Sequence, residues 1–411
     1  MSAVRDVVIV GGGPAGLAAA VELWKLGIHD ILIVEREKSL GGILRQCIHE
    51  GFGLTRFGEM LSGPEYAQRF MDQVEKLGIP YLVDTTVSSI DEEKNVTLVS
   101  KSGLVVLKAK AIIFAMGCRE RPRGALAIPG ERPSGVFTAG VAQNYINLQN
   151  RMIGKEIVIL GSGDIGMIMA RRLTLEGAHV KGVYEILPIP SGLARNIHQC
   201  LDDFDIPLHL SHTVTEIHGK ARLTGVTVSK VDEHLQPIPS TEERIDCDTL
   251  ILSVGLIPEN ELALDAGITL DRATRGAVVD QWMQTDRKGF FSCGNVLHVH
   301  DVVDFVSLEA EATARAVARY VHDGYLPECD IAVRAGENLS HVLPQKVDGK
   351  EDVVFSARSR RKLSNVSLEI VQNGTVISRK RVGRAVPAEM LDIRVEKGRF
   401  LGPGEVEVRL I

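Results

Sequence analysis

Two glycine-rich turns have the residue types and spacing that bind a diphosphate. They are residues 11–16 (GGGPAG) and residues 161–166 (GSGDIG). In such a turn the first glycine allows a tight reversal, the second lets the backbone approach a pyrophosphate, and the third lets helix and strand pack closely. A helix that begins at the turn adds free N–H groups and a partial positive charge, both of which favour phosphate.

Each turn lies inside a strand–helix–strand pattern. Apolar runs at residues 7–10 and 157–160 precede the turns, as expected of buried parallel strands. The predicted helices stop at Gly27 and Gly177, each 16 residues after the first glycine of its turn. The next strands end at Glu35 and Glu185, each 24 residues after that glycine, where a carboxylate can accept hydrogen bonds from a ribose.

The equal spacing of the two copies carries more weight than either motif alone. One glycine-rich turn is weak evidence, but two complete units at matched distances predict two Rossmann-like domains that each bind a dinucleotide. Apolar strands at residues 111–117 (AIIFAMG) and 249–255 (TLILSVG) close the two units after β-rich stretches. A further strand at residues 289–295 (GFFSCGN) precedes a long helix from about residue 305 to 320, which Asp304 is expected to cap.

Over about residues 1–325 these blocks resemble the pyridine-nucleotide–flavin oxidoreductases, the family of glutathione and thioredoxin reductases. The resemblance implies FAD in the first domain and NAD(H) in the second. It also implies that Gly294-Asn295 holds the ribityl and pyrophosphate part of the flavin, although Asn lacks the charge of the family's Asp. The helix that follows would begin beneath the flavin near Val306, where its dipole favours the reduced, anionic ring.

The motifs and the resemblance together give two sets of candidate binding residues. For FAD they are Gly11, Gly13, Pro14, Ala15, Gly16, Glu35, Arg36, Gly42, Val87, Ala115, Gly117, Gly294, Asn295 and Val306. For NAD they are Gly161, Gly163, Asp164, Ile165, Gly166, Glu185 and Gly255.

A narrower resemblance rests on residues 47–54 (CIHEGFGL), 117–121 (GCRER) and 137–140 (FTAG). These segments are similar to the flavin subunit that accompanies anaerobic-type glycerol-3-phosphate dehydrogenases, and to the larger subunits of heteromeric opine, sarcosine and proline oxidases. The resemblance implies a partner dehydrogenase or oxidase chain and, as in some relatives, a small cysteine-rich redox protein.

Cys47 and His49 are the candidate catalytic residues. Cys47 follows Gly41-Gly42, where disulfide-reducing relatives carry their redox dithiol, but the two family cysteines would align with Leu44 and His49. A disulfide reductase is therefore not expected, whereas a single reactive Cys47 stays open as an alternative. His298 and His300 are assigned to hydrogen bonding near the flavin, and no metal site is expected because no further ligand cluster accompanies them.

The predicted fold is α/β, with two Rossmann-like domains that carry β-meander insertions and a small C-terminal β-rich domain. The FAD domain is expected to be discontinuous, at residues 1–120 and 281–325, with the NAD domain at 121–280 and the third domain at 330–411. Asn373-Gly374 predicts a hairpin in the third domain. Two basic groups there, residues 358–362 and 379–384, favour a docking surface for an acidic partner.

Composition limits the remaining function classes. The net charge of −6 over 411 residues gives no reason to expect nucleic-acid binding. No apolar run is long enough to predict a membrane span, and six dispersed cysteines fit a reducing cytoplasm. We expect an oligomeric electron-transfer subunit that passes electrons between NAD(H) and FAD. The alternatives are a stand-alone NADH-dependent reductase that uses Cys47, and a flavin subunit whose second nucleotide site is structural.

Overall fold

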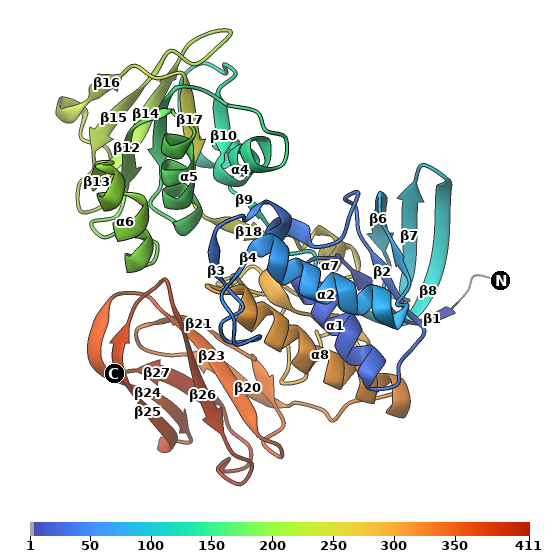
Figure 1. Cartoon of the computed structure of the whole chain (residues 1–411). Helices are drawn as coiled ribbons and strands as arrows, with labels where there is room; N and C mark the ends of the chain where they lie inside the picture. Colours follow the sequence, from blue (N-terminus) through green and yellow to red (C-terminus); the bar gives the residue numbers. More distant parts are fainter. Residues whose placement is uncertain (1–3) are drawn as a thin grey trace. The chain divides into compact units, whose positions relative to one another are not determined.

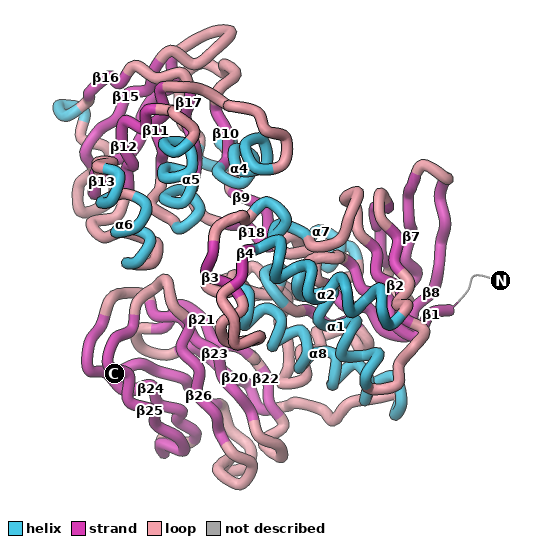
Figure 2. Tube along the Cα trace, viewed as in Figure 1, coloured by secondary structure: helices cyan, strands magenta, loops and turns pink. Residues whose placement is uncertain are grey.

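The computed structural model describes residues 4–411. The described chain forms two compact units: unit 1 contains the residues up to Cys118 together with Pro258–Ile411, and unit 2 contains Arg119–Ile257. Figure 1 labels their elements, and Figure 2 separates helices from strands. The chain passes between the units through β9 (Cys118–Glu120) and β18 (Leu256–Pro258).

One predicted boundary differs from the structure. Residues 258–280 were expected in the second nucleotide domain, but they belong to unit 1. The physical reason is their apolar side chains, because Ala263, Ile268 and Val279 are buried in the same core as Phe290 of the first sheet.

Unit 1 is built on one mixed sheet with the strand order β5-β2-β1-β8-β7-β6, to which β19 adds by pairing with β8. The first strand lies between β2 and β8, parallel to both, and β19 is also parallel to β8. The strands are β1 (Val4–Val10), β2 (Ile31–Val34), β5 (Tyr81–Leu82), β6 (Thr85–Ile90), β7 (Asn95–Ser100), β8 (Gly103–Phe114) and β19 (Phe290–Ser292).

Both faces of this sheet are covered, which explains why its strands are continuously apolar. Val7 and Ile9 face a core that includes three helices, whereas Val8 and Val10 face a second core that includes α7 (Glu261–Asp265). The three helices are α1 (Pro14–Lys25), α2 (Gly63–Leu77) and α8 (Val303–Asp323). Short elements complete this part of the unit: β3 (Glu50–Phe52), β4 (Leu61–Ser62), η1 (Gly42–Gln46) and η4 (Gly294–Val296).

Unit 2 repeats the same plan. Its parallel sheet has the order β10-β17-β11-β12-β13, so that β11 lies between β12 and β17 as β1 lies between β2 and β8. The strands are β10 (Val136–Thr138), β11 (Glu156–Leu160), β12 (His179–Glu185), β13 (Leu208–Leu210) and β17 (Thr249–Leu252), with an antiparallel meander of β14 (His212–His218), β15 (Gly225–Lys230) and β16 (Glu243–Ile245). The helices are α3 (Arg123–Leu126), α4 (Ala139–Asn147), α5 (Asp164–Leu175) and α6 (Ala194–Cys200), with short turns η2 (Asp202–Phe204) and η3 (Pro239–Thr241).

The C-terminal part of unit 1 is a β-sandwich with its own core. One sheet has the order β22-β20-β27-β24-β25 and the other has the order β21-β23-β26. The strands are β20 (Ile331–Ala335), β21 (Leu339–Leu343), β22 (Lys346–Val347), β23 (Val353–Ser359), β24 (Leu363–Gln372), β25 (Thr375–Ala385), β26 (Met390–Val395) and β27 (Val406–Leu410). The hairpin predicted at Asn373-Gly374 is confirmed, because it joins the antiparallel pair β24 and β25.

In the first basic group only Arg358 is withdrawn from the surface. The other basic residues of the group, Arg360, Arg361 and Lys362, are exposed, so the docking surface stays a prediction. Arg358 is largely buried, and its guanidinium donates hydrogen bonds to the backbone carbonyls of Val299 and Pro387 at 2.8 Å each. In the second group, Arg379 pairs with the buried carboxylate of Glu369, whereas Arg381 and Arg384 are exposed. Arg358 therefore attaches the sandwich to the segment that follows the flavin-binding turn.

Two further observations do not point to a function. No helix within residues 4–411 has both the length and the apolar character to cross a membrane.

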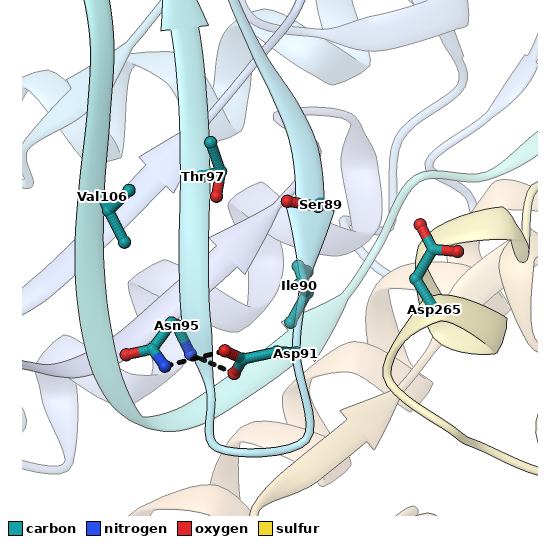
Figure 3. Close-up of a pocket in the computed structure, with 7 residues that line it drawn as sticks. All are labelled: Ser89, Ile90, Asp91, Asn95, Thr97, Val106 and Asp265. Carbon is teal, nitrogen blue, oxygen red and sulfur yellow. Dashed lines mark hydrogen bonds between the residues drawn. The ribbon is translucent and has the colours of Figure 1, made fainter.

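Figure 3 shows a pocket on the meander β6-β7-β8, lined by residues such as Thr97 and by Asp265 of α7. Asp91 in this pocket already accepts hydrogen bonds from Asn95, and none of the predicted nucleotide-binding residues lines it.

The packing between β1 and α1 generates a stability prediction. A side-chain carbon on Gly16 would lie 1.9 Å from the carbonyl oxygen of Gly11, which is backbone and cannot rotate away. We expect Gly16→Ala to lower the free energy of unfolding by about 1–3 kcal/mol, the usual range for overpacking, and to reduce the amount of flavin that co-purifies. Thermal unfolding and flavin absorbance measure both effects. Gly124→Ala is the matched control, because a side chain there meets no atom within 4 Å; an equal loss in both variants would contradict the prediction.

Candidate functional site

The turn after β1 provides a cradle for a diphosphate. Gly11 has a φ of +108°, and a side chain there would lie 2.4 Å from the carbonyl oxygen of Ala115. Gly13 is the N-cap of α1 and offers no side-chain cap, and Pro14 occupies the first helical position. The first-turn N–H groups of α1 therefore have no side chain that caps them, which is the arrangement that accepts a phosphate.

Glu35 holds this turn in shape from the end of β2. Its carboxylate is buried and accepts hydrogen bonds from the backbone N–H groups of Gly12 and Glu37, each at 2.8 Å. A carboxylate at this position fixes the glycine turn and retains lone pairs for a ribose hydroxyl. Arg36, the next residue in the predicted set, is exposed.

Several other predicted FAD residues come together around the same turn. Gly42 lies against Gly13, since a side chain on Gly42 would be 2.9 Å from the Cα atom of Gly13. A side chain on Gly294 would lie 2.9 Å from the Cβ atom of Ala15 and 3.2 Å from Val306. The contact between Gly294 and Ala15 thus joins the first glycine turn to a segment more than 250 residues later in the sequence.

The remaining two FAD candidates are placed less directly. Gly117 follows the end of β8 with a φ of +71°. Val87 lies on β6, where its side chain is part of the core and the pairing with β7 shifts register at the next residues. No contact places either residue against the glycine turn, so their roles stay predictions.

The second turn repeats the cradle, but more of its polar groups are already hydrogen-bonded within the protein. Gly163 is the N-cap of α5, again with no side-chain cap, and Glu185 accepts hydrogen bonds from the backbone N–H groups of Ser162 and Leu187 at 2.9 and 3.0 Å. The Glu185 carboxylate also accepts hydrogen bonds from the hydroxyls of Ser162 and Ser191, at 2.6 and 3.0 Å. The N–H of Gly166 donates to the hydroxyl of Ser253, at 3.0 Å. One donor of this helix terminus is therefore satisfied within the protein.

The other second-turn candidates have local partners. Asp164 accepts hydrogen bonds from Leu193 and Asn196, so its carboxylate positions the loop before α6. Ile165 lies in the first turn of α5, and Gly255 follows β17 with a φ of +98°. The loop between Glu185 and Gly192 contains no Lys or Arg.

The turn after β19 is held by Glu309, a residue that the sequence did not single out. Its buried carboxylate accepts a hydrogen bond from the N–H of Gly294 at 2.7 Å and faces the ring nitrogen of His298 at 2.8 Å. Asn295 accepts hydrogen bonds from His300, including its backbone N–H at 3.0 Å. Glu is common on the exposed first turns of helices, so the sequence alone does not single out Glu309. What distinguishes Glu309 is that its position on α8 brings its carboxylate to the N–H of Gly294.

The electrostatics of this cluster keep one charge buried. Burial alone would raise the pKa of Glu309, but the adjacent imidazoles of His298 and His300 hold that pKa well below its usual range. Burial and the neighbouring His300 lower the pKa of His298, and burial lowers the pKa of His341 on β21 to about 4. Glu309 therefore stays ionised near pH 7, whereas His298 and His341 stay neutral.

Asp304 does not cap α8, which corrects the sequence-based expectation. The N-cap is Val302, and Asp304 lies inside the first turn, where no side-chain hydrogen bond caps the helix. It accepts hydrogen bonds from the backbone N–H groups of Gly53, Thr55 and Arg56 at 2.7–3.1 Å. Asp304 therefore fixes the loop that follows Cys47 and His49.

Cys47 and His49 lie between η1 and β3. The Cys47 thiol is half-buried against the start of α2, and burial raises its pKa to about 12. His49 is half-buried and its ring packs against Phe52 with ring centroids 5.0 Å apart. A thiol with this pKa is almost entirely protonated at neutral pH, which disfavours a role as nucleophile.

Residues 5–319 match the sequence model of one protein family, described as pyridine nucleotide-disulphide oxidoreductase. The chain belongs to this family. Membership identifies it as an oxidoreductase whose cofactors are FAD and a pyridine nucleotide. The two cradles fit these groups, because each has an open helix terminus, glycines where a side chain would clash, and a carboxylate at the ribose position.

Curated relatives in this family include subunits of larger enzymes. The chain is 27% identical to the HcnB subunit of hydrogen cyanide synthase from Pseudomonas protegens, a match that covers 70% of this chain and 65% of that protein. It is 29% identical to thioredoxin reductase of Listeria monocytogenes, over 71% of this chain and 86% of the relative. It is 23% identical to an opine oxidase subunit of Agrobacterium tumefaciens, over 71% and 61%. The chain thus spans less than two thirds of the length of HcnB and of the opine oxidase subunit.

The fold agrees with that of solved family members. The crystal structure of Lactococcus lactis thioredoxin reductase superimposes with a TM-score of 0.63 at 22% identity, covering 78% of this chain and 99% of that chain. This similarity confirms the predicted α/β architecture with two Rossmann-like parts.

The contacts of Asp304 give a prediction for the loop at residues 53–56. Asp304→Ala leaves three backbone N–H groups without their acceptor. The N–H of Gly53 is buried, and one unsatisfied buried donor costs about 1–3 kcal/mol, whereas water can reach the N–H groups of Thr55 and Arg56 more readily. We expect a lower melting temperature, by about 2–4 °C for each kcal/mol lost, and faster proteolysis near Arg56. Calorimetry and mass spectrometry of limited digests measure these effects.

The control for this experiment is Asp323→Ala, which removes an exposed carboxylate at the other end of the same helix. Unchanged proteolysis near Arg56 in Asp304→Ala would show that the carboxylate does not hold the loop.

Proposed function

We propose that the chain is the flavin subunit of a heteromeric dehydrogenase and passes electrons between NAD(H) and its bound FAD. The observation that carries this proposal is the site next to Gly42, where Leu44 is buried and Cys47 is a thiol with a strongly raised pKa. These residues do not provide the dithiol that a disulfide reductase needs. Electrons from the flavin then require another acceptor or donor.

The relatives support a protein partner. HcnB and the opine oxidase relative are both named as subunits, and the narrower sequence resemblance is to flavin subunits that work beside a substrate-oxidising chain. We propose a partner of the glycerol-3-phosphate or amino-acid and opine type, together with a small cysteine-rich redox protein. When bound, the two cofactors supply hydride transfer, so this half-reaction needs no acid or base from the protein.

The test of the proposal is anaerobic mixing of the purified chain with NADH while flavin absorbance is recorded. We expect the flavin to bleach, and we expect the tagged chain to retrieve a substrate-oxidising subunit in equal amounts from its native host. An unbleached flavin would favour a structural role for the second nucleotide site. Turnover of small disulfides by the chain alone would contradict the subunit role.

The surroundings of Glu185 predict a preference for NADH over NADPH. A 2′-phosphate at the ribose position would meet this carboxylate with no Lys or Arg in the following loop, and like charges about 4 Å apart cost roughly 1–4 kcal/mol. We expect the second-order rate constant of flavin reduction to be at least about tenfold higher with NADH. Stopped-flow absorbance measures both rate constants.

Glu185→Gln should reduce this discrimination, whereas Glu176→Gln, which changes an exposed carboxylate at the end of α5, should preserve it. Equal use of both nucleotides by the unmodified chain would contradict the assignment of Glu185.

Two predictions concern Cys47: the pH at which its thiol reacts with an alkylating agent, and the number of electrons that the protein takes up per FAD. Because its pKa is about 12, well above the usual value, we expect alkylation by iodoacetamide to be slow at pH 8 and to accelerate as the pH rises toward 12. Cys47→Ser should retain flavin reduction by NADH, and dithionite titration should take two electrons per FAD in both proteins. Uptake of four electrons per FAD would reveal a second redox centre and would support the stand-alone reductase instead.

A further inference from the structure

Three buried side chains between η4 and α8 direct donor atoms at one point. The Oε2 atom of Glu309 lies 2.8 Å from Nε2 of His298 and 3.4 Å from Nε2 of His300. The side chains are 13%, 2% and 4% exposed, respectively. One ligand atom from each residue lies within 4.8 Å of the others.

The hydrogen bonds of His300 determine which of its ring nitrogens carries the proton. Its Nδ1 atom lies 3.3 Å from Oδ1 of Asn295, and the same Oδ1 accepts the backbone N–H of His300 at 3.0 Å. An amide oxygen only accepts hydrogen bonds, so the ring proton belongs on Nδ1. The Nε2 atom then presents a lone pair to the carboxylate of Glu309, and two lone pairs that face each other require a positive species between them.

The spacing of the donors matches what a metal ion would require. An ion about 2.0–2.2 Å from each nitrogen and oxygen holds neighbouring donors roughly 3.3–3.6 Å apart in tetrahedral geometry. The 3.4 Å separation falls within this range, the 2.8 Å separation would widen by about half an ångström, and all three donor atoms already lie within 4.8 Å of one another. We propose that His298, His300 and Glu309 bind a divalent transition-metal ion.

The surrounding contacts orient the proposed ligands. The second oxygen of Glu309 is fixed by the N–H of Gly294, and Asn295 fixes the ring of His300, which are the outer contacts that metal ligands usually have. Two imidazoles and one carboxylate favour zinc or ferrous iron over magnesium or calcium, which prefer oxygen donors. The two histidines alone do not indicate a metal site in the sequence, because the third ligand, Glu309, lies on the following helix, nine residues beyond His300.

The ion would fasten the segment between the flavin turn and the β-sandwich. The same segment receives the hydrogen bond of Arg358 at Val299, and the ring of His298 lies 6.3 Å from that of His341 on β21. The ion would thus act on loop structure, and its presence can be measured without any assay of turnover.

The test begins with protein purified without a polyhistidine tag and analysed by inductively coupled plasma mass spectrometry. We expect one transition-metal ion per chain. After dialysis against a chelator, isothermal titration calorimetry with zinc chloride should restore one bound ion and raise the melting temperature. His300→Ala and Glu309→Gln should each weaken zinc binding by more than about tenfold.

The matched control is His322→Ala, which removes an exposed histidine from α8 and should leave zinc binding unchanged. Flavin absorbance and circular dichroism of each variant show whether it is folded. The unmodified chain decides the question even if a variant fails to fold. A chain that purifies without metal and takes up no zinc in the calorimeter would show that a proton lies between His300 and Glu309, and the proposal would be wrong.

Discussion

Each nucleotide-binding part of this protein depends on a reversal of the chain that leaves no room for a side chain. Gly16 approaches the carbonyl oxygen of Gly11 so closely that even one methyl group would clash, and Gly166 approaches Gly161 in the second unit. This contact sets the distance between helix and strand. It thereby places an open helix terminus at the end of the parallel sheet, and Glu35 or Glu185 then locks the turn from the neighbouring strand.

Features encoded by residues close in sequence could be predicted, and those that depend on distant residues could not. Both glycine turns, their helices and their acidic residues lie within short segments, so periodicity and spacing identified them. The partners of Asp304 lie about 250 residues away, and nothing near Gly53 indicates that its N–H needs a carboxylate. The boundary predicted after residue 280 differs from the observed one at Pro258 for the same reason, because Ala263 and Ile268 complete a core whose other side is the first sheet.

Helix α8 connects the parts of the candidate flavin site. Asp304 holds the loop after His49, Glu309 holds the turn at Gly294, and Arg56 forms an ion pair with Glu311 at 2.6 Å. Each carboxylate is buried or half-buried and receives several donors, which offsets the cost of removing its charge from water. The β-sandwich joins the same region through Arg358, which donates a hydrogen bond to the backbone carbonyl of Val299.

The pairing of β19 with β8 has a consequence for how the chain folds during its synthesis on the ribosome. Ile112 and Ile113 pair with Phe290 and Phe291, so the first sheet is finished only after the whole of unit 2 has been synthesised. Unit 2 is continuous and can fold as soon as it emerges. The part of unit 1 that is synthesised before unit 2 meanwhile exposes an unpaired strand edge and the apolar side of α1, and both favour aggregation. Nascent chains of this protein are therefore expected to need a chaperone until α8 leaves the ribosome.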